Sequence, residues 1–223
     1  KSSPQLTIKE AAAKALLQNP TLSAFSLEKR VKEAQTLQAG LRPNPHLEMK
    51  IDDLAGSGKF SEFDSSEMTI QLGQLIELGG KRAARVNASR ISEKLADWDY
   101  KSKRLDVLTE VNKAFVEVLM AQHKVSLSED LIKLGNQFYN AVSERVRVGK
   151  IAPIEKIKAG VVLSTFKLEK KQTKMMLGQS RIKLSSTWGS TEPEFISVIG
   201  NLFEISPVPP LQPLNRKVSE TPY

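Results

Sequence analysis

The sequence offers few side chains of the kinds that catalyse reactions or bind metal ions. It has no cysteine and two histidines, His46 and His123, which lie in different segments and outside any HxxxH or HExxH spacing. The "GSG" at 56–58 precedes a strand-like segment rather than a helix, which argues against a phosphate-binding loop. Met175 and Met176 are typical of packing rather than of a thioether metal site. We therefore predict no enzyme, no metal site and no cofactor.

The basic residues could bind nucleic acid. Lys and Arg number 33 against 25 Asp and Glu, giving a formal charge of +8. These cations are spread among acids along helical segments, however, and only 6% of the residues are aromatic side chains that could stack on bases. A solvated helix face explains the same charge. We expect no nucleic-acid partner, and salt-sensitive DNA binding would show otherwise.

One basic cluster lies at a break between two long helical segments, in "RVRVGKIAPIE" at 145–155. Gly149 permits a tight chain reversal, and Pro153 suits the first position of a new helix. The break carries three cations: Arg145, Arg147 and Lys150. A plain helix–helix connection explains the glycine and the proline but not the cations.

Very long helices are predicted on both sides of this break. Between Lys81 and Val148 the chain has no proline and one glycine, Gly135. Apolar residues recur there every three or four positions: Leu105, Leu108, Phe115, Leu119, Leu127, Leu131, Leu134, Phe138 and Val142. Such a coiled-coil-like seam would run for roughly 100 Å and must pack on other helices. In the return helix, from Pro153 to about Ser186, we expect five residues to face inward: Ile154, Ile157, Val161, Leu168 and Met175.

Two shorter helices are predicted near the N-terminus. The first spans 6–19, where Thr7 and Glu10 form a capping box and Asn19-Pro20 ends the helix. The second spans about 21–39 and ends before the prolines of "RPNP".

Between the short and the long helices the period changes to two, which predicts a β-hairpin from "HLEMKID" (46–52) and "MTIQLGQ" (68–74). One face is apolar and the other polar. With their flanks the strands reach the roughly 9–11 residues that a tilted strand needs to cross a bilayer. Half of a small soluble sheet has the same pattern. No apolar run is long enough for a transmembrane helix.

The succession of motifs resembles a known family. It comprises "LTIKEA…NP", "AGLRPNPHL" before a strand, "QLIELGGKRAAR" opening a long helix, "RVRVGKIAPIE" at a turn and "WG" after the return helix. In this order, over about residues 6–210, it resembles the TolC-type outer-membrane efflux factors. The similarity is greatest to the branch that serves cobalt–zinc–cadmium or copper–silver exporters.

The resemblance implies a mainly α fold with a β-hairpin. Very long antiparallel coiled-coil-like helices would be joined to transmembrane strands of an oligomeric β-barrel. The implied segments are an equatorial helix (1–20), a periplasmic helix (21–43), an outer-membrane hairpin (44–79), a long periplasmic helix (80–148), a tip (149–152), a return helix (153–189) and a proline-rich linker toward a second repeat (190–223).

The resemblance also implies roles for particular residues. The lipid-facing residues would be Leu47, Met49, Ile51, Met68, Ile70 and Leu72. The lumen-facing residues would be Glu48, Lys50, Asp52, Thr69 and Gln71, and residues 54–67 would form an external loop. An adaptor protein would dock at Arg145, Arg147, Val148, Gly149, Lys150, Ile151, Ala152, Pro153 and Glu155.

The implied function is a passive conduit in the outer membrane of a Gram-negative bacterium, extending into the periplasm, for export of metal cations or small toxic compounds. Its implied partners are further copies of itself (a trimer at full length), a periplasmic adaptor, an inner-membrane RND pump and outer-membrane lipid. The alternative is a soluble, adaptor-like periplasmic hairpin or scaffolding protein.

Two departures from the family pattern affect this interpretation. The chain carries one strand–helix repeat where the family has two. Two strands cannot close a barrel, so we expect a truncated product, a fragment, or about six copies in place of three. In addition, Ala152 stands where this branch tends to have serine. Alanine cannot cap the following helix, and this costs roughly 1 kcal/mol of helix stability.

Overall fold

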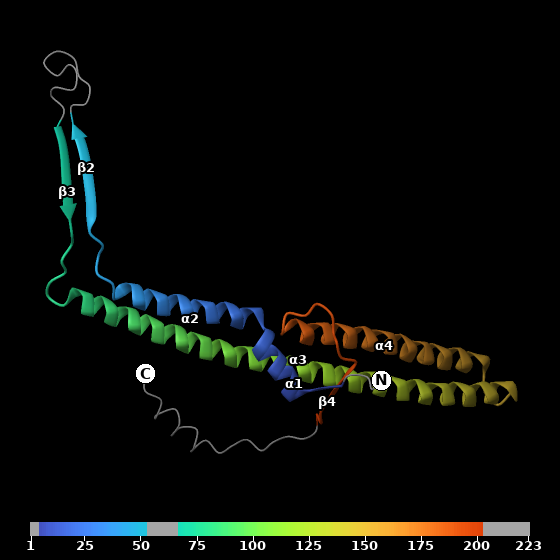
Figure 1. Cartoon of the computed structure of the whole chain (residues 1–223). Coiled ribbons are helices and arrows are strands. Elements are labelled where there is room, and N and C mark those ends of the chain that lie inside the picture. The colour runs from blue at the N-terminus through green and yellow to red at the C-terminus, as the bar shows by residue number, and fades with distance from the viewer. Residues whose placement is uncertain (1–4, 53–66, 203–223) are drawn as a thin grey trace, which may run out of the picture. The chain divides into compact units, whose positions relative to one another are not determined.

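A computed structural model of the chain describes residues 5–52 and 67–202. The GSG motif, almost all of the predicted external loop and the approach to a second repeat (203–223) lie outside the described residues. The elements, in chain order, are β1 (Gln5–Thr7), α1 (Ile8–Gln18), α2 (Pro20–Ala39), β2 (His46–Asp52), β3 (Glu67–Gly73), α3 (Lys81–Arg147), α4 (Pro153–Ser186) and β4 (Ser197–Ile199) (Figure 1). The prediction of a mainly helical chain with a β-hairpin and two very long helices is confirmed.

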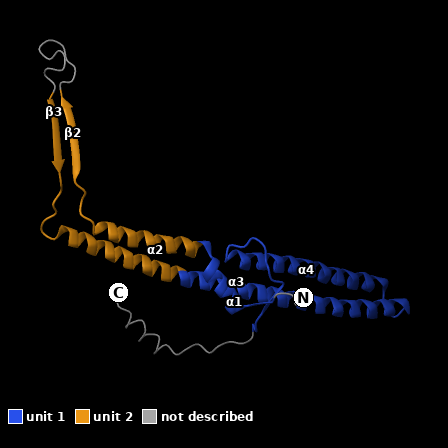
Figure 2. Ribbon diagram, in the orientation of Figure 1, with its two compact units in different colours: residues 1–20, 104–223 blue, residues 21–103 orange. Residues whose placement is uncertain are grey.

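The chain divides into two compact units, and α3 contributes residues to both (Figure 2). The first unit comprises residues 1–20 and 104–223, and the second comprises residues 21–103. Among the described residues, no helix is both long enough and apolar enough to cross a membrane.

In the first unit, the predicted capping box at the start of α1 is confirmed. The Thr7 hydroxyl accepts a hydrogen bond from the Glu10 backbone N–H at 3.3 Å, and the Thr7 N–H donates to the Glu10 carboxylate at 2.8 Å. This second bond favours the charged carboxylate and lowers the pKa of Glu10 below its ordinary value. Two N–H groups of the first turn are thereby satisfied.

The first unit also contains a strand pair that the sequence did not predict. β1 and β4 pair in parallel, with Leu6 opposite Val198. The Gln122 side chain completes the pairing, because its amide donates to the Val198 carbonyl at 3.1 Å and its oxygen accepts from the Val198 N–H at 2.7 Å. The prediction of a linker from residue 190 onward is therefore wrong for residues 195–199, where Phe195 and Val198 are buried. Three-residue strands between prolines have no local periodicity, so only the distant partner reveals them.

Within the first unit, the end of α4 contacts the residues that follow α1. The Asn19 side chain donates to the Thr187 carbonyl at 2.7 Å. Gly189 follows with φ +81°, and a Cβ at that position would lie 3.1 Å from Cγ of Pro20. The predicted "WG" motif therefore ends α4 at a place where only glycine fits without strain.

The helices α3 and α4 pack through a face of α4 other than the one predicted. Ile154, Ile157, Val161, Leu168 and Met175 were expected to face inward, but these side chains are 50–62% exposed. The buried residues of α4 are Ala159, Leu163, Thr173, Leu184 and Ser185. Small side chains let the two backbones approach closely, which is why this face is preferred although it is less apolar.

On α3 the predicted seam is divided between the inside and the outside. Phe115 and Leu119 are buried together with Val111 and Val118. Four other members of the seam are 54–66% exposed: Leu105, Leu127, Leu134 and Phe138. The remaining three, Leu108, Leu131 and Val142, are half-buried. On a helix with two apolar stripes, the residues of both stripes recur with the same period near 3.6. The spacing alone therefore could not tell the buried stripe from the exposed one.

Gly135 of α3 lies against side chains of α4, which leads to a testable prediction. A Cβ at Gly135 would lie 2.9 Å from the Phe166 ring, whereas a Cβ at Gly178 would meet nothing within 4 Å. We expect Gly135→Leu to lower the free energy of unfolding by about 1–3 kcal/mol through overpacking. Gly178→Leu is expected to be neutral or to stabilise by up to about 1 kcal/mol through helix propensity.

Circular dichroism of the two purified variants during urea unfolding would measure this contrast. Equal changes in the two variants would contradict the close approach of the helices at Gly135.

In the second unit, α2 packs along the first part of α3 through polar contacts. The Lys29 amine lies 2.8 Å from the Asp97 carboxylate, and the Thr36 and Ser89 hydroxyls are 3.2 Å apart. Hydrogen bonds from Lys101 and Lys29 lower the pKa of Asp97 to about 2. Asp97 is thus held in its charged form and links α2 to α3.

Candidate functional site

The β2–β3 hairpin has two chemically distinct faces. Its strands pair antiparallel, and the register sets Leu47 opposite Leu72, Met49 opposite Ile70 and Ile51 opposite Met68. Every second cross-strand pair is therefore apolar on both strands. These six side chains are 49–74% exposed, so among the described residues no other part of the chain covers this face.

The opposite face of the hairpin is polar. The register pairs Glu48 with Gln71 and Lys50 with Thr69. The Lys50 amine also lies 2.8 Å from the Asp52 carboxylate, two positions along the same strand. All five residues predicted to face a lumen are therefore on one face of the hairpin: Glu48, Lys50, Asp52, Thr69 and Gln71. That this face lines a water-filled lumen stays a prediction.

His46 has a local structural role in the hairpin. It lies opposite Gly73, and a Cβ on that glycine would be 2.4 Å from the imidazole ring. The ring thus occupies the space that a side chain at position 73 would need. Among the residues that the structure describes, no group of three or more His, Asp or Glu is placed to hold a metal ion.

The reversal between α3 and α4 is a Schellman motif. The Lys150 N–H donates to the Arg145 carbonyl at 2.9 Å, and the Gly149 N–H donates to the Val146 carbonyl at 3.0 Å. Gly149 has φ +70°, the left-handed conformation that this motif requires. Pro153 then begins α4. Ala152 precedes it and makes no side-chain capping hydrogen bond, because a methyl group cannot accept one.

The three cations of the reversal are not equivalent. Arg147 donates from Nε to the Glu144 carboxylate at 2.8 Å, so its charge is neutralised within the last turn of α3. Arg145 and Lys150 make no ion pair with any residue that the structure describes. At the start of α4 Glu155 is paired with Lys158 at 2.8 Å. The cations available to a partner are therefore Arg145 and Lys150.

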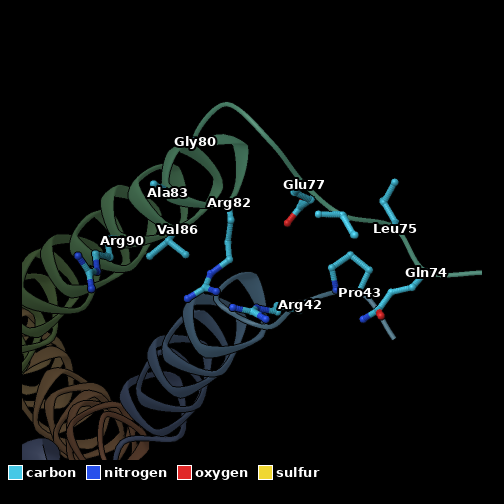
Figure 3. Close-up of a pocket in the computed structure, with 11 residues that line it drawn as sticks. Arg42, Pro43, Gln74, Leu75, Glu77, Gly80, Arg82, Ala83, Val86 and Arg90 are labelled. Carbon is cyan, nitrogen blue, oxygen red and sulfur yellow. The ribbon is translucent and has the colours of Figure 1, made fainter. Parts of the chain in front are cut away.

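A basic cavity beside the hairpin was not predicted from the sequence. It has a volume of about 740 Å³ and lies in the second unit, between the end of α2, the β3–α3 connection and the first turns of α3 (Figure 3). Three arginines line it: Arg42, Arg82 and Arg90. These residues are far apart in sequence, so their clustering had no local signal other than "GGKRAAR" at the helix start.

The fold is that of outer-membrane channel proteins. The Campylobacter jejuni CmeC outer membrane channel superposes with a TM-score of 0.69 at 17% identity, covering 89% of this chain and 45% of CmeC. CusC, a protein that forms a transmembrane channel, superposes with a TM-score of 0.69 at 16% identity, covering 92% of this chain and 47% of CusC.

The family is shown by the sequence model of the outer membrane efflux proteins, which matches residues 11–190. The chain belongs to this family. The cobalt-zinc-cadmium resistance protein CzcC of Cupriavidus metallidurans is 32% identical over 217 residues, which are 97% of this chain and 50% of CzcC. The chain thus spans about half the length of this relative, and the resemblance stated from the motifs is confirmed.

Proposed function

We propose that this chain is a subunit of an outer-membrane efflux channel, a passive conduit for metal cations or small toxic compounds rather than an enzyme. The observation that carries the proposal is the uncovered apolar face of the β2–β3 hairpin. Six large apolar side chains in cross-strand pairs cannot stay in water without a cover, and lipid is the cover that strands of this length and alternation fit.

The strands would join those of other copies in a barrel, because two strands leave open edges that lipid does not tolerate. In this arrangement the apolar face contacts lipid and the polar face lines the lumen. The helices would extend into the periplasm of a Gram-negative cell.

Exposed stripes on the helices support assembly with further helices. Along α4 large apolar side chains recur every seven residues: Ile154, Val161, Leu168, Met175 and Ile182. Along α3 the same spacing connects Met120, Leu127, Leu134 and Val148, with Ala141 between the last two. Heptad stripes pack on neighbouring helices in left-handed coiled coils, and further copies of the chain would supply those helices.

The tip at 145–155 would dock a periplasmic adaptor, and an inner-membrane pump of the RND class would supply the energy. The similarity to a cobalt-zinc-cadmium resistance protein supports metal cations as the exported substrate. An adaptor-like soluble hairpin is less favoured, since it would leave the apolar face of the hairpin unexplained.

Cell fractionation followed by mass measurement tests the proposal. We expect the protein in the outer-membrane fraction, extracted only with detergent, as an assembly of several copies whose number follows from its mass. A water-soluble monomer that keeps its helical circular dichroism without detergent would refute the channel and favour the adaptor-like alternative.

A further inference from the structure

The basic cavity carries an uncompensated positive charge. Among the described residues that line it, Glu77 is the one acidic residue. Both carboxylate oxygens of Glu77 accept hydrogen bonds from Arg85, one of them at 3.0 Å. Arg85 also donates from Nε to the Ala39 carbonyl at 3.0 Å and so joins the end of α2 to the β3–α3 connection. The Glu77–Arg85 pair is thus a neutral structural element of the cavity wall.

The three arginines of the lining make no direct ion pair, although the Arg82 charge contributes, after Arg85, to lowering the pKa of Glu77. Arg42, Arg82 and Arg90 are exposed and form no ion pair with any residue in the described ranges 5–52 and 67–202. Arg42 and Arg82 both line the cavity, and in the view of Figure 3 their side chains point toward the same part of it. Two like charges repel at such a position, and an anion that bridges them would remove the repulsion. Guanidinium groups match the geometry of phosphate oxygens, to which they donate paired hydrogen bonds.

Apolar residues adjoin this cavity on the side of the hairpin. Leu75 and Ile76 line it and are 65% and 74% exposed, and the neighbouring Leu78 is 74% exposed. A free inorganic anion needs no such neighbours. A lipid does, because its phosphate is attached to acyl chains.

The position of the cavity relative to the hairpin fits the membrane interface. The apolar face of the hairpin ends at the pair Leu47 and Leu72. Arg42 precedes Leu47 by five residues, which span at most about 17 Å at roughly 3.3 Å per residue. A bilayer has a headgroup layer of about 5–7 Å on each side of its hydrocarbon core. Leu75 and Ile76 can extend the apolar surface toward this layer and leave the arginines within it.

We propose that this cavity binds the phosphate of an anionic phospholipid in the periplasmic leaflet of the outer membrane. Arg42 and Arg82 contact the phosphate oxygens, Arg90 adds positive charge deeper along α3, and Leu75 and Ile76 contact the upper acyl chains. This inference rests on the proposed function, since it places the hairpin in a membrane. A lipid bound in this cavity would fix the depth of the hairpin in the membrane relative to the helices of the same unit.

The test compares lipid retention by the purified full chain in detergent, using native mass spectrometry with added phosphatidylglycerol. We expect the double variant R42Q/R82Q to retain phosphatidylglycerol at least about tenfold more weakly than the unsubstituted protein, at about 1 kcal/mol per cation near a lipid surface. The double variant K167Q/K171Q removes the same charge from exposed positions on α4 and is expected to retain the lipid unchanged. Equal retention by R42Q/R82Q and the unsubstituted protein would overturn the inference.

The unsubstituted protein alone supplies a second test, which holds even if R42Q/R82Q fails to assemble. Phosphatidylglycerol should outcompete zwitterionic phosphatidylcholine, and inorganic phosphate at millimolar concentration should not displace it. Displacement by inorganic phosphate would identify a free-anion site and overturn the lipid assignment. If the protein is a detergent-extracted assembly without selective lipid retention, only this inference fails. If it is a water-soluble monomer, the proposed function fails as well.

Discussion

Ile70→Arg is expected to remove the protein from the outer membrane, whereas Gln71→Arg at the next position is expected to leave it there. Ile70 pairs with Met49 at the centre of the β2–β3 register, and its side chain is 56% exposed. An arginine on the lipid face near the bilayer midplane costs about 2–4 kcal/mol. Each copy in an assembly would bear this cost, which is a large fraction of the stability of an ordinary protein.

Gln71 is a matched control because it lies one residue away, on the polar face, and is also exposed. Immunodetection in separated outer-membrane and soluble fractions would measure the effect for both variants. If the hairpin were half of a soluble sheet with this face open to water, both substitutions would be tolerated alike. Equal amounts of the two variants in the outer membrane would therefore contradict the lipid-facing assignment.

Lys150→Glu is expected to abolish export while the channel still assembles. The Lys150 amine has no ion-pair partner among the described residues, and the backbone at this position is held by the Schellman motif through Gly149. A substitution of the side chain therefore leaves the turn intact. If Lys150 is a central contact for the adaptor, with an effect of about 2 kcal/mol, its loss weakens docking by about thirty-fold.

Growth in increasing metal concentration would measure export in a strain whose own channel is deleted, with the cognate adaptor and pump present. Lys171→Glu makes the same charge change on an exposed part of α4 away from the tip and should preserve tolerance. Arg147→Gln should have a smaller effect than Lys150→Glu, because Glu144 already neutralises Arg147. If the Lys150→Glu strain tolerated metal as well as the unsubstituted strain, the docking role of the tip would be contradicted and only its role as a turn would remain.

Those features of the protein that depend on local interactions could be predicted from its sequence. The capping box at Thr7, the chain reversal at Gly149 and the two faces of the hairpin each involve residues within a few positions of one another or a period of two. Backbone conformation and periodicity decide such features before any distant segment is in place. The residues that the resemblance implies for the site stay predictions, and they could be named from the sequence because each set is contiguous or alternates along the chain.

The tertiary structure alone decided which surfaces meet. The α4 stripe that includes Ile157 and Leu168 is more apolar than the stripe that includes Ala159 and Thr173, yet the latter packs on α3. The reason is that close approach depends on side-chain size as well as on hydrophobicity, and the sequence pattern reports mainly the second. The pairing of β1 with β4 and the gathering of arginines beside the hairpin likewise depend on residues far apart in sequence. Local periodicity carries no information about such distant neighbours, which only the folded chain brings together.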